Sequence, residues 1–163
     1  MDDIYRFVYR KIGDTQTSED IVSSVWIKIL NKIENYEEQS GATFKSWIYR
    51  IAHNSVIDYY RTKREQTDID EIPEPSFSLD FGKMIDDKDK LKEVVSYLKS
   101  ISSKEREIVF LRVWDDMSYR EISEIVGESV DNCKQIYSRS IKKIQANITL
   151  TVFLIIIISI IKL

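Results

Sequence analysis

Apolar residues recur at helical spacing in three stretches of the first 64 residues. The first covers residues 4–12 and is followed by Gly13, a common residue just beyond a helix end. The second runs from about residue 18 to residue 34, and Thr17 is a candidate cap for it. The third covers residues 44–60. The pattern predicts a three-helix unit in which each helix has one apolar face.

The third stretch combines basic and aromatic residues. We expect Phe44 and Trp47 to lie on its buried face. The side chains expected on the opposite, exposed face are Lys45, Tyr49, Arg50, Asn54 and Arg61. Cations neutralise phosphates and aromatic faces stack on unpaired bases, so this face predicts contact with an opened nucleic-acid strand. A solvated helix face without a ligand is the alternative.

Charge is distributed unevenly in a chain whose net charge is only -3. Residues 42–64 carry five basic residues and one acid, and residues 131–147 carry four basic residues and one acid. Between them, residues 65–89 carry nine acids, two lysines and two prolines, a composition that predicts a linker. Two basic segments on either side of an acidic linker favour two separate nucleic-acid contacts.

Helix-capping signals define a second module after the linker. Ser102 and Ser118 each stand three residues before a glutamate, which predicts two capping boxes. The second box opens a short helix over residues 119–126 that stops at Gly127, and Ser129 caps a longer helix directly afterwards. This is the layout of a helix-turn-helix, whose second helix enters the major groove. An ordinary helical hairpin buried in a bundle is the alternative.

The second helix of this motif has one apolar and one polar face. Its expected core residues are Val130, Cys133, Tyr137, Ile141 and Ile144. Its expected outward residues are Asp131, Asn132, Lys134, Gln135, Ser138, Arg139 and Lys142. Asn132 and Gln135 have amides suited to paired hydrogen bonds with adenine, whereas the basic side chains are expected to hold phosphates.

Other chemistry is not indicated. The sequence has no glycine-rich phosphate loop, no paired carboxylates with a pocket and no nucleophile beside a base, so an enzyme is not expected. His53 has no companion at ligand spacing and Cys133 is the single cysteine, so we expect no metal site, no disulfide and no cofactor. One cysteine also fits a reducing cytoplasm, where we expect the protein to reside.

We therefore predict an all-α protein of two small helical modules joined by an acidic linker. The predicted parts are residues 1–64 as the first domain, 65–89 as the linker, 90–147 as the second domain and 148–163 as a hydrophobic tail.

Two segments of the chain resemble the extracytoplasmic-function (ECF) sigma factors of bacterial RNA polymerase. The second conserved region of that family is similar to SEDIVSSVWIKILNKIENYEEQSGATFKSWIYRIAHNSVIDYYRTKR. The fourth region is similar to ISSKEREIVFLRVWDDMSYREISEIVGESVDNCKQIYSRSIKKI. The patterns FxxWxYRIAxN and LRxxxxxSYxEIxEIxG within them are each specific, and they occur in the order of the family.

This resemblance implies a subunit that binds core RNA polymerase and takes part in promoter recognition and melting. The helix that binds the polymerase corresponds to residues 18–33, and the implied contacts are Glu19, Asp20, Val22, Trp26 and Leu30. The loop over residues 37–43 and the helix after it correspond to the part that captures an unstacked base of the minus-ten element and follows the opened strand. The implied contacts there are Gln39, Ser40, Lys45, Tyr49, Arg50, Asn54, Arg61 and Arg64.

The helix over residues 130–144 corresponds to the reader of the duplex minus-thirty-five element. The implied contacts are Ser118, Asn132, Lys134, Gln135, Ser138, Arg139 and Lys142. The start of this helix departs from the family, which commonly has a small residue, Thr and Val there and an Arg soon after. The departures are Asp131, Asn132, Cys133 and Ile136, so a base preference does not carry over.

The implied partners are core RNA polymerase, promoter DNA and an anti-sigma factor. The runner-up hypothesis is an autonomous helix-turn-helix regulator of transcription, which would bind duplex DNA without the polymerase.

Residues 148–161, ITLTVFLIIIISII, form an uncharged apolar segment that is atypical of the family. As a helix this segment would be about 21 Å long, shorter than the roughly 30 Å hydrocarbon core of a bilayer. Three interpretations stay open: a short anchor that tethers a cytoplasmic protein to a membrane, a helix that docks on protein, and a chain end that lacks its continuation.

Overall fold

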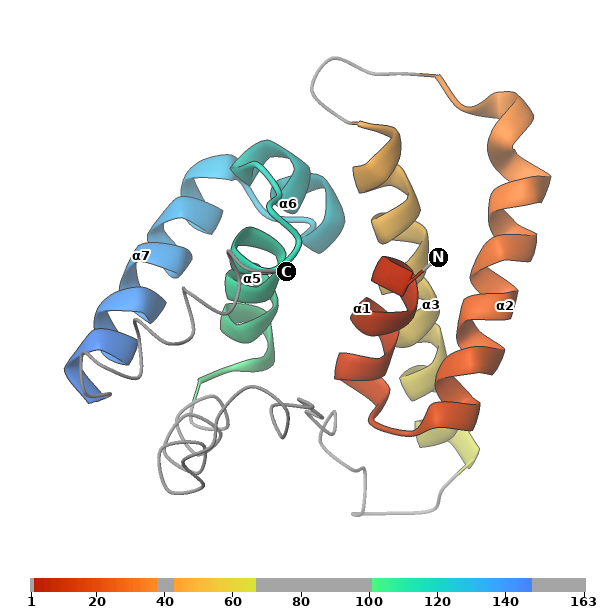
Figure 1. The fold of residues 1–163 in the computed structure, drawn as a ribbon, viewed down its shortest axis with the longest axis horizontal. Helices are drawn as coiled ribbons and strands as arrows, with labels where there is room; N and C mark the ends of the chain where they lie inside the picture. The colour runs from red at the N-terminus through yellow and green to blue at the C-terminus, as the bar shows by residue number, and fades with distance from the viewer. Residues whose placement is uncertain (1, 38–42, 67–100, 148–163) are drawn as a thin grey trace. The chain divides into compact units, whose positions relative to one another are not determined.

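The structure, a computed structural model, describes residues 2–37, 43–66 and 101–147. These described residues divide into two compact units, one built on residues 2–37 and 43–66 and the other on residues 101–123 and 127–147. All regular elements within the described residues are helices (Figure 1). The predicted all-α fold of two helical modules is therefore confirmed.

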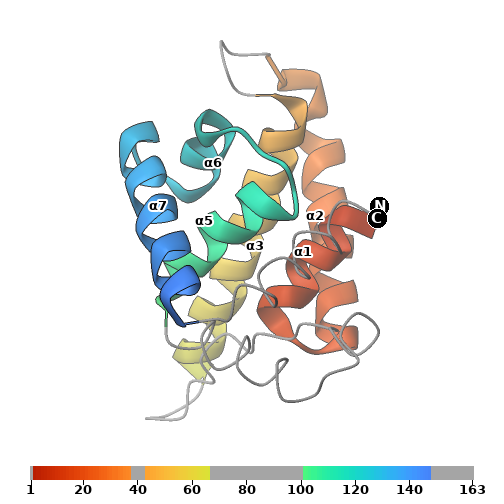
Figure 2. The ribbon, with the colours of Figure 1, turned by 60° about the vertical axis from the view of Figure 1, so that its left-hand side comes forward.

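The first unit is a bundle of three helices. Its elements are α1 (Asp2–Ile12), α2 (Thr15–Lys32), the short 3-10 helix η1 (Ile33–Asn35) and α3 (Phe44–Gln66). The helices α2 and α3 run antiparallel beside each other, and α1 packs against both (Figures 1 and 2). The core is formed by apolar residues of all three helices, among them Phe7, Val8, Val25, Ala52 and Val56.

The start of α2 differs from the prediction. Gly13 ends α1 as expected, with a left-handed φ of 75° and its N–H bonded to the Tyr9 carbonyl at 2.8 Å. The cap of the next helix is Asp14 rather than Thr17, because the Asp14 carboxylate accepts a hydrogen bond from the Thr17 N–H at 2.8 Å. Because the chain turns at Gly13, the second helix begins only two residues later. It starts at Thr15 instead of residue 18.

The buried face of α3 is also rotated relative to the prediction. Tyr49, which we expected to be exposed, is 2% exposed and packs edge-on against Phe7 with ring centroids 5.1 Å apart. Phe44, expected in the core, is 41% exposed. The buried stripe passes through Ser46, Tyr49 and Val56 because the helix meets α1 and α2 along that line. Aromatic residues at neighbouring positions made the two faces difficult to separate by periodicity.

The second unit contains α5 (Ser103–Val113), α6 (Tyr119–Val126) and α7 (Val130–Asn147). The capping boxes at Ser102 and Ser118 are both present, which confirms the prediction. Gly127 adopts the left-handed conformation with φ 69° and ends α6. The hydroxyl of Ser129 then accepts from the Asn132 N–H at 3.1 Å and caps α7. The predicted helix–turn–helix, α6 followed by α7, is therefore confirmed.

The core of the second unit lies between α5, α6 and α7, with α5 and α7 packed together (Figure 2). Its fully buried side chains include Ile108, Leu111, Met117, Ile122 and Cys133. Burial raises the pKa of the Cys133 thiol, so this residue behaves as a small core side chain, as predicted.

Several predicted segments lie outside the described residues. These are nearly all of the linker at 65–89, the beginning of the second domain before residue 101 and the tail at 148–163. Within the described helices, none combines the length and the apolar character required to cross a bilayer.

Candidate nucleic-acid and polymerase interfaces

The exposed face of α3 carries a stripe that follows the helix axis and consists of three arginines, one asparagine and one isoleucine. Its members are spaced alternately four and three residues apart and are all exposed: Arg50, Asn54, Ile57, Arg61 and Arg64. This spacing places them on one face of an α-helix. The Arg61 guanidinium contacts the Asp58 carboxylate at 3.1 Å, with the Arg61 side chain 69% exposed. The stripe can therefore present several cations to a phosphate backbone.

Tyr49 does not belong to this stripe, which corrects its predicted role as a strand contact. Its ring is buried in the bundle core, and Lys45 lies over that ring with Nζ 5.9 Å from the ring centroid. Lys45 is exposed, so it stays a candidate phosphate contact. The remaining minus-ten candidates, Gln39 and Ser40, lie outside the described residues.

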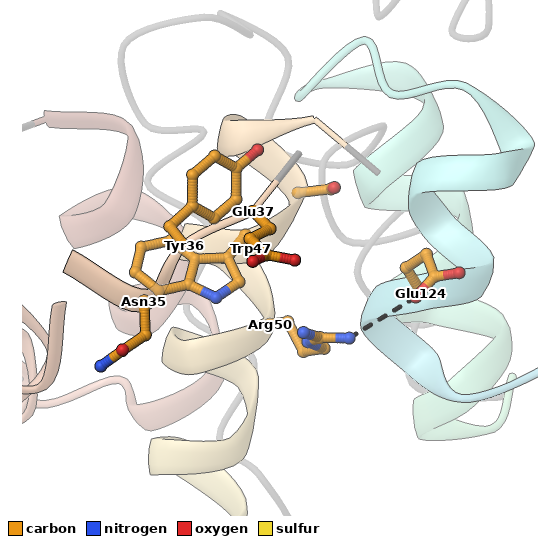
Figure 3. Close-up of a pocket in the computed structure, with 7 residues that line it drawn as sticks. Asn35, Tyr36, Glu37, Trp47, Arg50 and Glu124 are labelled. Atoms are coloured by element: carbon orange, nitrogen blue, oxygen red, sulfur yellow. Dashed lines mark hydrogen bonds and ion pairs between the residues drawn. The ribbon is translucent and has the colours of Figure 1, made fainter. Parts of the chain in front are cut away.

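An aromatic cluster formed by Tyr36, Phe44 and Trp47 flanks residues 38–42 on both sides. The ring centroids of Tyr36 lie 5.1 Å from Phe44 and 5.0 Å from Trp47, and those of Phe44 and Trp47 lie 5.6 Å apart. Figure 3 shows the Tyr36 ring beside the Trp47 indole, with Arg50 one turn further along α3. We had not identified Tyr36 from the sequence, although its position directly before a polar loop was a usable signal. The cluster therefore places aromatic rings close to the cationic side chain of Arg50.

The outer face of α2 is partly apolar. Glu19 and Asp20 are exposed near its start, Val22 and Trp26 are half-buried, and Leu30 is 68% exposed near its end. Two further exposed apolar residues extend the surface: Ile27 at 60% and Ile33 at 45%. The apolar core line of α2 consists of Ile21, Val25 and Ile29, which leaves Leu30 and Ile33 exposed. The result is an exposed apolar surface next to two acids.

The polar face of α7 is exposed where it was expected to be. Its exposed side chains are Asp131, Lys134, Gln135, Ser138, Arg139 and Lys142. Asn132 differs, because it is half-buried and its Nδ2 donates a hydrogen bond to the Glu128 carboxylate at 2.7 Å. Ser118 is exposed, but its hydroxyl is occupied in the capping box with Glu121.

In the described part of the second unit, two ion pairs join the first turn of α5 to the chain segment that carries α7, one in the turn before α7 and one on α7 itself. Lys104 of α5 donates to Glu128, and Lys143 of α7 contacts Glu105 of α5 at 2.9 Å. The hydrogen bond from Lys104 and then that from Asn132 lower the pKa of Glu128. The hydrogen bond from Lys143 and then that from the Ser102 N–H lower the pKa of Glu105. Both shifts favour the charged carboxylates that these ion pairs require.

A helix-turn-helix unit with a basic recognition helix, together with a second helical unit carrying a cationic stripe, defines a protein that binds nucleic acid. Family comparison makes this class specific. Residues 1–66 match the model of Sigma-70 region 2, and residues 91–144 match that of Sigma-70 region 4.

Full-length relatives give the same result. The chain is 24% identical over 147 residues to the ECF RNA polymerase sigma factor SigM of Bacillus subtilis (strain 168), covering 90% of this chain and 88% of SigM. It is 27% identical over 143 residues to the RNA polymerase sigma factor SigZ of the same organism, covering 85% and 77% of the two chains.

Solved structures show the same fold. The sigma factor RpoE in its complex with the anti-sigma factor NepR from Bartonella quintana matches with a TM-score of 0.64 and 20% identity, over 89% of each chain. CnrH, solved with the cytosolic domain of CnrY, matches with a TM-score of 0.58 and 19% identity, over 89% of this chain and 80% of CnrH.

The chain belongs to the ECF sigma factors and acts in the initiation of transcription. This family is not a family of enzymes. The comparisons give no support to the runner-up hypothesis of an autonomous regulator.

Proposed function

We propose that the two units divide the work of initiation between three surfaces. The outer face of α2 binds core RNA polymerase, the stripe of α3 with the aromatic cluster holds the opened minus-ten strand, and α7 reads the minus-thirty-five duplex. The single observation that carries this proposal is the different chemistry of the exposed residues. Apolar side chains are exposed on α2, whereas cationic side chains are exposed on α3 and α7.

The assignment of α2 to the polymerase rests on the chemistry of its surface. Leu30 and Ile27 are more than half exposed, and such apolar residues are suited to the buried centre of a protein interface rather than to a phosphate backbone. Glu19 and Asp20 would repel DNA but can pair with basic residues of a protein partner.

The assignment of α3 to the opened strand rests on the combination of cations and rings. The basic stripe follows the helix axis, as a strand backbone would, and the Tyr36–Phe44–Trp47 cluster supplies ring faces for an unstacked base. Base stacking on aromatic side chains contributes about 1–3 kcal/mol per base, enough to favour strand separation locally. Gln39 and Ser40, which lie between Tyr36 and Phe44 in the sequence, are proposed as further contacts to the opened strand.

The assignment of α7 to the duplex rests on the helix-turn-helix. Lys134, Arg139 and Lys142 are exposed on α7 and are proposed to hold phosphates, while Gln135 and Ser138 face the base edges.

An anti-sigma factor is the proposed regulatory partner. The neighbouring RpoE structure contains the anti-sigma factor NepR, and we extend this kind of partner to the present chain because the two folds agree. The exposed apolar face of α2 is the surface that such a protein would need to cover in order to compete with the polymerase.

Transcription with purified components tests the proposal. Core polymerase with the protein is expected to initiate on a genomic DNA library at sites that share two spaced sequence elements, whereas core polymerase alone does not. A protein that shifts duplex DNA without core polymerase, and gives no specific transcripts with it, would overturn the proposal in favour of an autonomous regulator.

A further inference from the structure

Asp58 of α3 lies between two cations of the first unit. Its Oδ1 is 3.1 Å from the guanidinium of Arg61, one turn further along α3, and its Oδ2 is 3.9 Å from Nζ of Lys28 on α2. The Lys28 ammonium also donates a hydrogen bond to the Ser55 hydroxyl at 2.9 Å, and that hydroxyl donates to the Ile51 carbonyl at 2.9 Å. Lys28 is therefore held against α3 by a second contact, beside the carboxylate.

The two cations differ in how accessible they are to a ligand. The side chain of Arg61 is 69% exposed, whereas that of Lys28 is 40% exposed and bridges two helices. Arg61 is a member of the α3 stripe, while Lys28 contacts Ser55, which is buried. A strand that follows the stripe meets Arg61, so Arg61 is the cation that can exchange the Asp58 carboxylate for a phosphate.

That exchange depends on what compensates Asp58 afterwards. With Lys28 in place, the carboxylate keeps a cation 3.9 Å away, and the two cations and one acid leave a net charge of +1. Without the Lys28 charge, Asp58 would hold Arg61 more strongly, and the departure of Arg61 would leave an uncompensated carboxylate close to a phosphate. Like charges repel, so strand binding would be opposed at this position.

We propose that Lys28 is a positioning residue for the opened minus-ten strand: it compensates the Asp58 carboxylate, so that Arg61 can turn from Asp58 to a phosphate. Lys28 itself does not contact the strand. The inference rests on the proposed role of the α3 stripe. It gives α2, the helix with the proposed polymerase surface, a separate contribution to strand binding.

A double-mutant cycle with holoenzyme tests the inference. Opening is measured by permanganate reactivity on a promoter obtained from the transcription experiment, and core binding by fluorescence titration. Lys28→Met removes the charge and keeps an unbranched side chain. It is expected to reduce the equilibrium of opening by about threefold, the effect of an exposed ion pair, and to leave core binding unchanged. An equal fall in core binding would overturn the inference, because the loss would not be specific to the strand.

The same substitution is then combined with Asp58→Asn. Without the carboxylate, Lys28 has no acid to compensate, so Lys28→Met is expected to leave opening unchanged in this background. A direct phosphate contact by Lys28, or a general effect of its charge, would instead give the same loss in both backgrounds. Equal losses would overturn the inference, as would the absence of a loss in either background.

Lys32→Met is the matched control, because Lys32 is an exposed lysine one turn further along α2. It is expected to leave opening unchanged, and a loss equal to that of Lys28→Met would overturn the inference. Arg61→Ala, which is expected to weaken opening, separates the inference from the proposed function. Equal losses in the cycle together with weakened opening in Arg61→Ala would overturn the inference alone. Unchanged opening in Arg61→Ala would overturn the proposed role of the stripe as well.

Discussion

Tyr49 and Leu30 are large side chains on neighbouring helices of the same unit, yet Tyr49 is 2% exposed and Leu30 is 68% exposed. The first therefore contributes to folding, through its contact with Phe7, and the second is available for binding. Substitutions at the two positions should separate these contributions.

Tyr49→Ala is expected to lower the free energy of unfolding by about 3 kcal/mol or more, because it leaves a cavity where the ring meets Phe7. Urea denaturation measures this effect. Asn54→Ala, on the exposed face of the same helix, should change stability by less than about 0.5 kcal/mol. Equal stability of the two variants would show that Tyr49 is not a core residue.

Leu30→Ala is expected to weaken binding to core polymerase by about 1–2 kcal/mol, roughly 5- to 30-fold, with little change in stability. Binding is measured by fluorescence titration with labelled protein. Ile57→Ala is the matched control, because Ile57 is an exposed apolar residue of α3, 49% exposed, outside the proposed polymerase surface. Equal losses for the two variants would contradict the assignment of α2.

Helix caps, side-chain exposure and side-chain hydrogen bonds were predictable only where residues close together in the sequence determine them. The capping boxes at Ser102 and Ser118 depend on residues three positions apart, so the sequence contains all the information. The exposures of Tyr49 and Phe44 depend on which line of α3 meets the other helices, and two aromatic residues near each other fit either line. The hydrogen bond between Asn132 and Glu128 joins polar residues whose spacing alone does not show that they are bonded.

At the scale of elements, the first turn of α5 makes two ion pairs: Lys104 pairs with Glu128 in the turn before α7, and Glu105 pairs with Lys143 of α7. The recognition helix is thus presented by a charged clamp as well as by a core. These ion pairs require charged carboxylates, so the stability of the second unit is expected to depend on pH.

Glu105 gives the expected pH dependence. Its pKa in the folded protein is lowered from the ordinary 4.5, chiefly by the hydrogen bond from Lys143, so the folded state favours the charged carboxylate. The stabilisation is complete above the unfolded pKa of 4.5 and is lost as pH falls through the lower folded value. Thermal melting followed from pH 7 to pH 3 is expected to show a loss at the acid end that is smaller in Glu105→Gln. Asp116→Asn serves as the control, and an unchanged acid loss in Glu105→Gln would contradict the clamp.

The stripe on α3 is tested by charge reversal. Arg50→Glu with Arg61→Glu is expected to reduce open-complex formation by more than tenfold while core binding changes less than threefold, because the cations are proposed to hold the strand only. Permanganate reactivity measures opening, and titration measures core binding. Arg6→Glu, a reversal on α1 at a side chain that is 61% exposed and outside the three proposed surfaces, controls for general charge effects. Equal reductions in both assays for the double variant would refute the assignment.

Element boundaries show the same division between local and distant causes. The turn from α6 to α7 was predictable from Gly127 and Ser129, which determine it locally. The start of α2 was missed by three residues, because the cap at Asp14 works only after Gly13 has reversed the chain.

At the scale of the whole molecule, the family match shows a sigma factor, and the exposed surfaces support the proposal that its contacts for protein and DNA are separate. The two-module organisation was predictable from capping signals and charge segments, since each module is encoded by consecutive residues. The aromatic cluster around Tyr36 was not predictable, because it brings together residues that precede and follow residues 38–42 in the sequence.

The most direct measurement of this division of labour is a combined footprint on one promoter, with DNase protection and permanganate reactivity recorded with and without core polymerase. The account predicts, only with core polymerase present, a protected duplex at the minus-thirty-five element and reactive thymines at the minus-ten element. Protection of both elements by the protein alone, without reactive thymines when core polymerase is added, would contradict it.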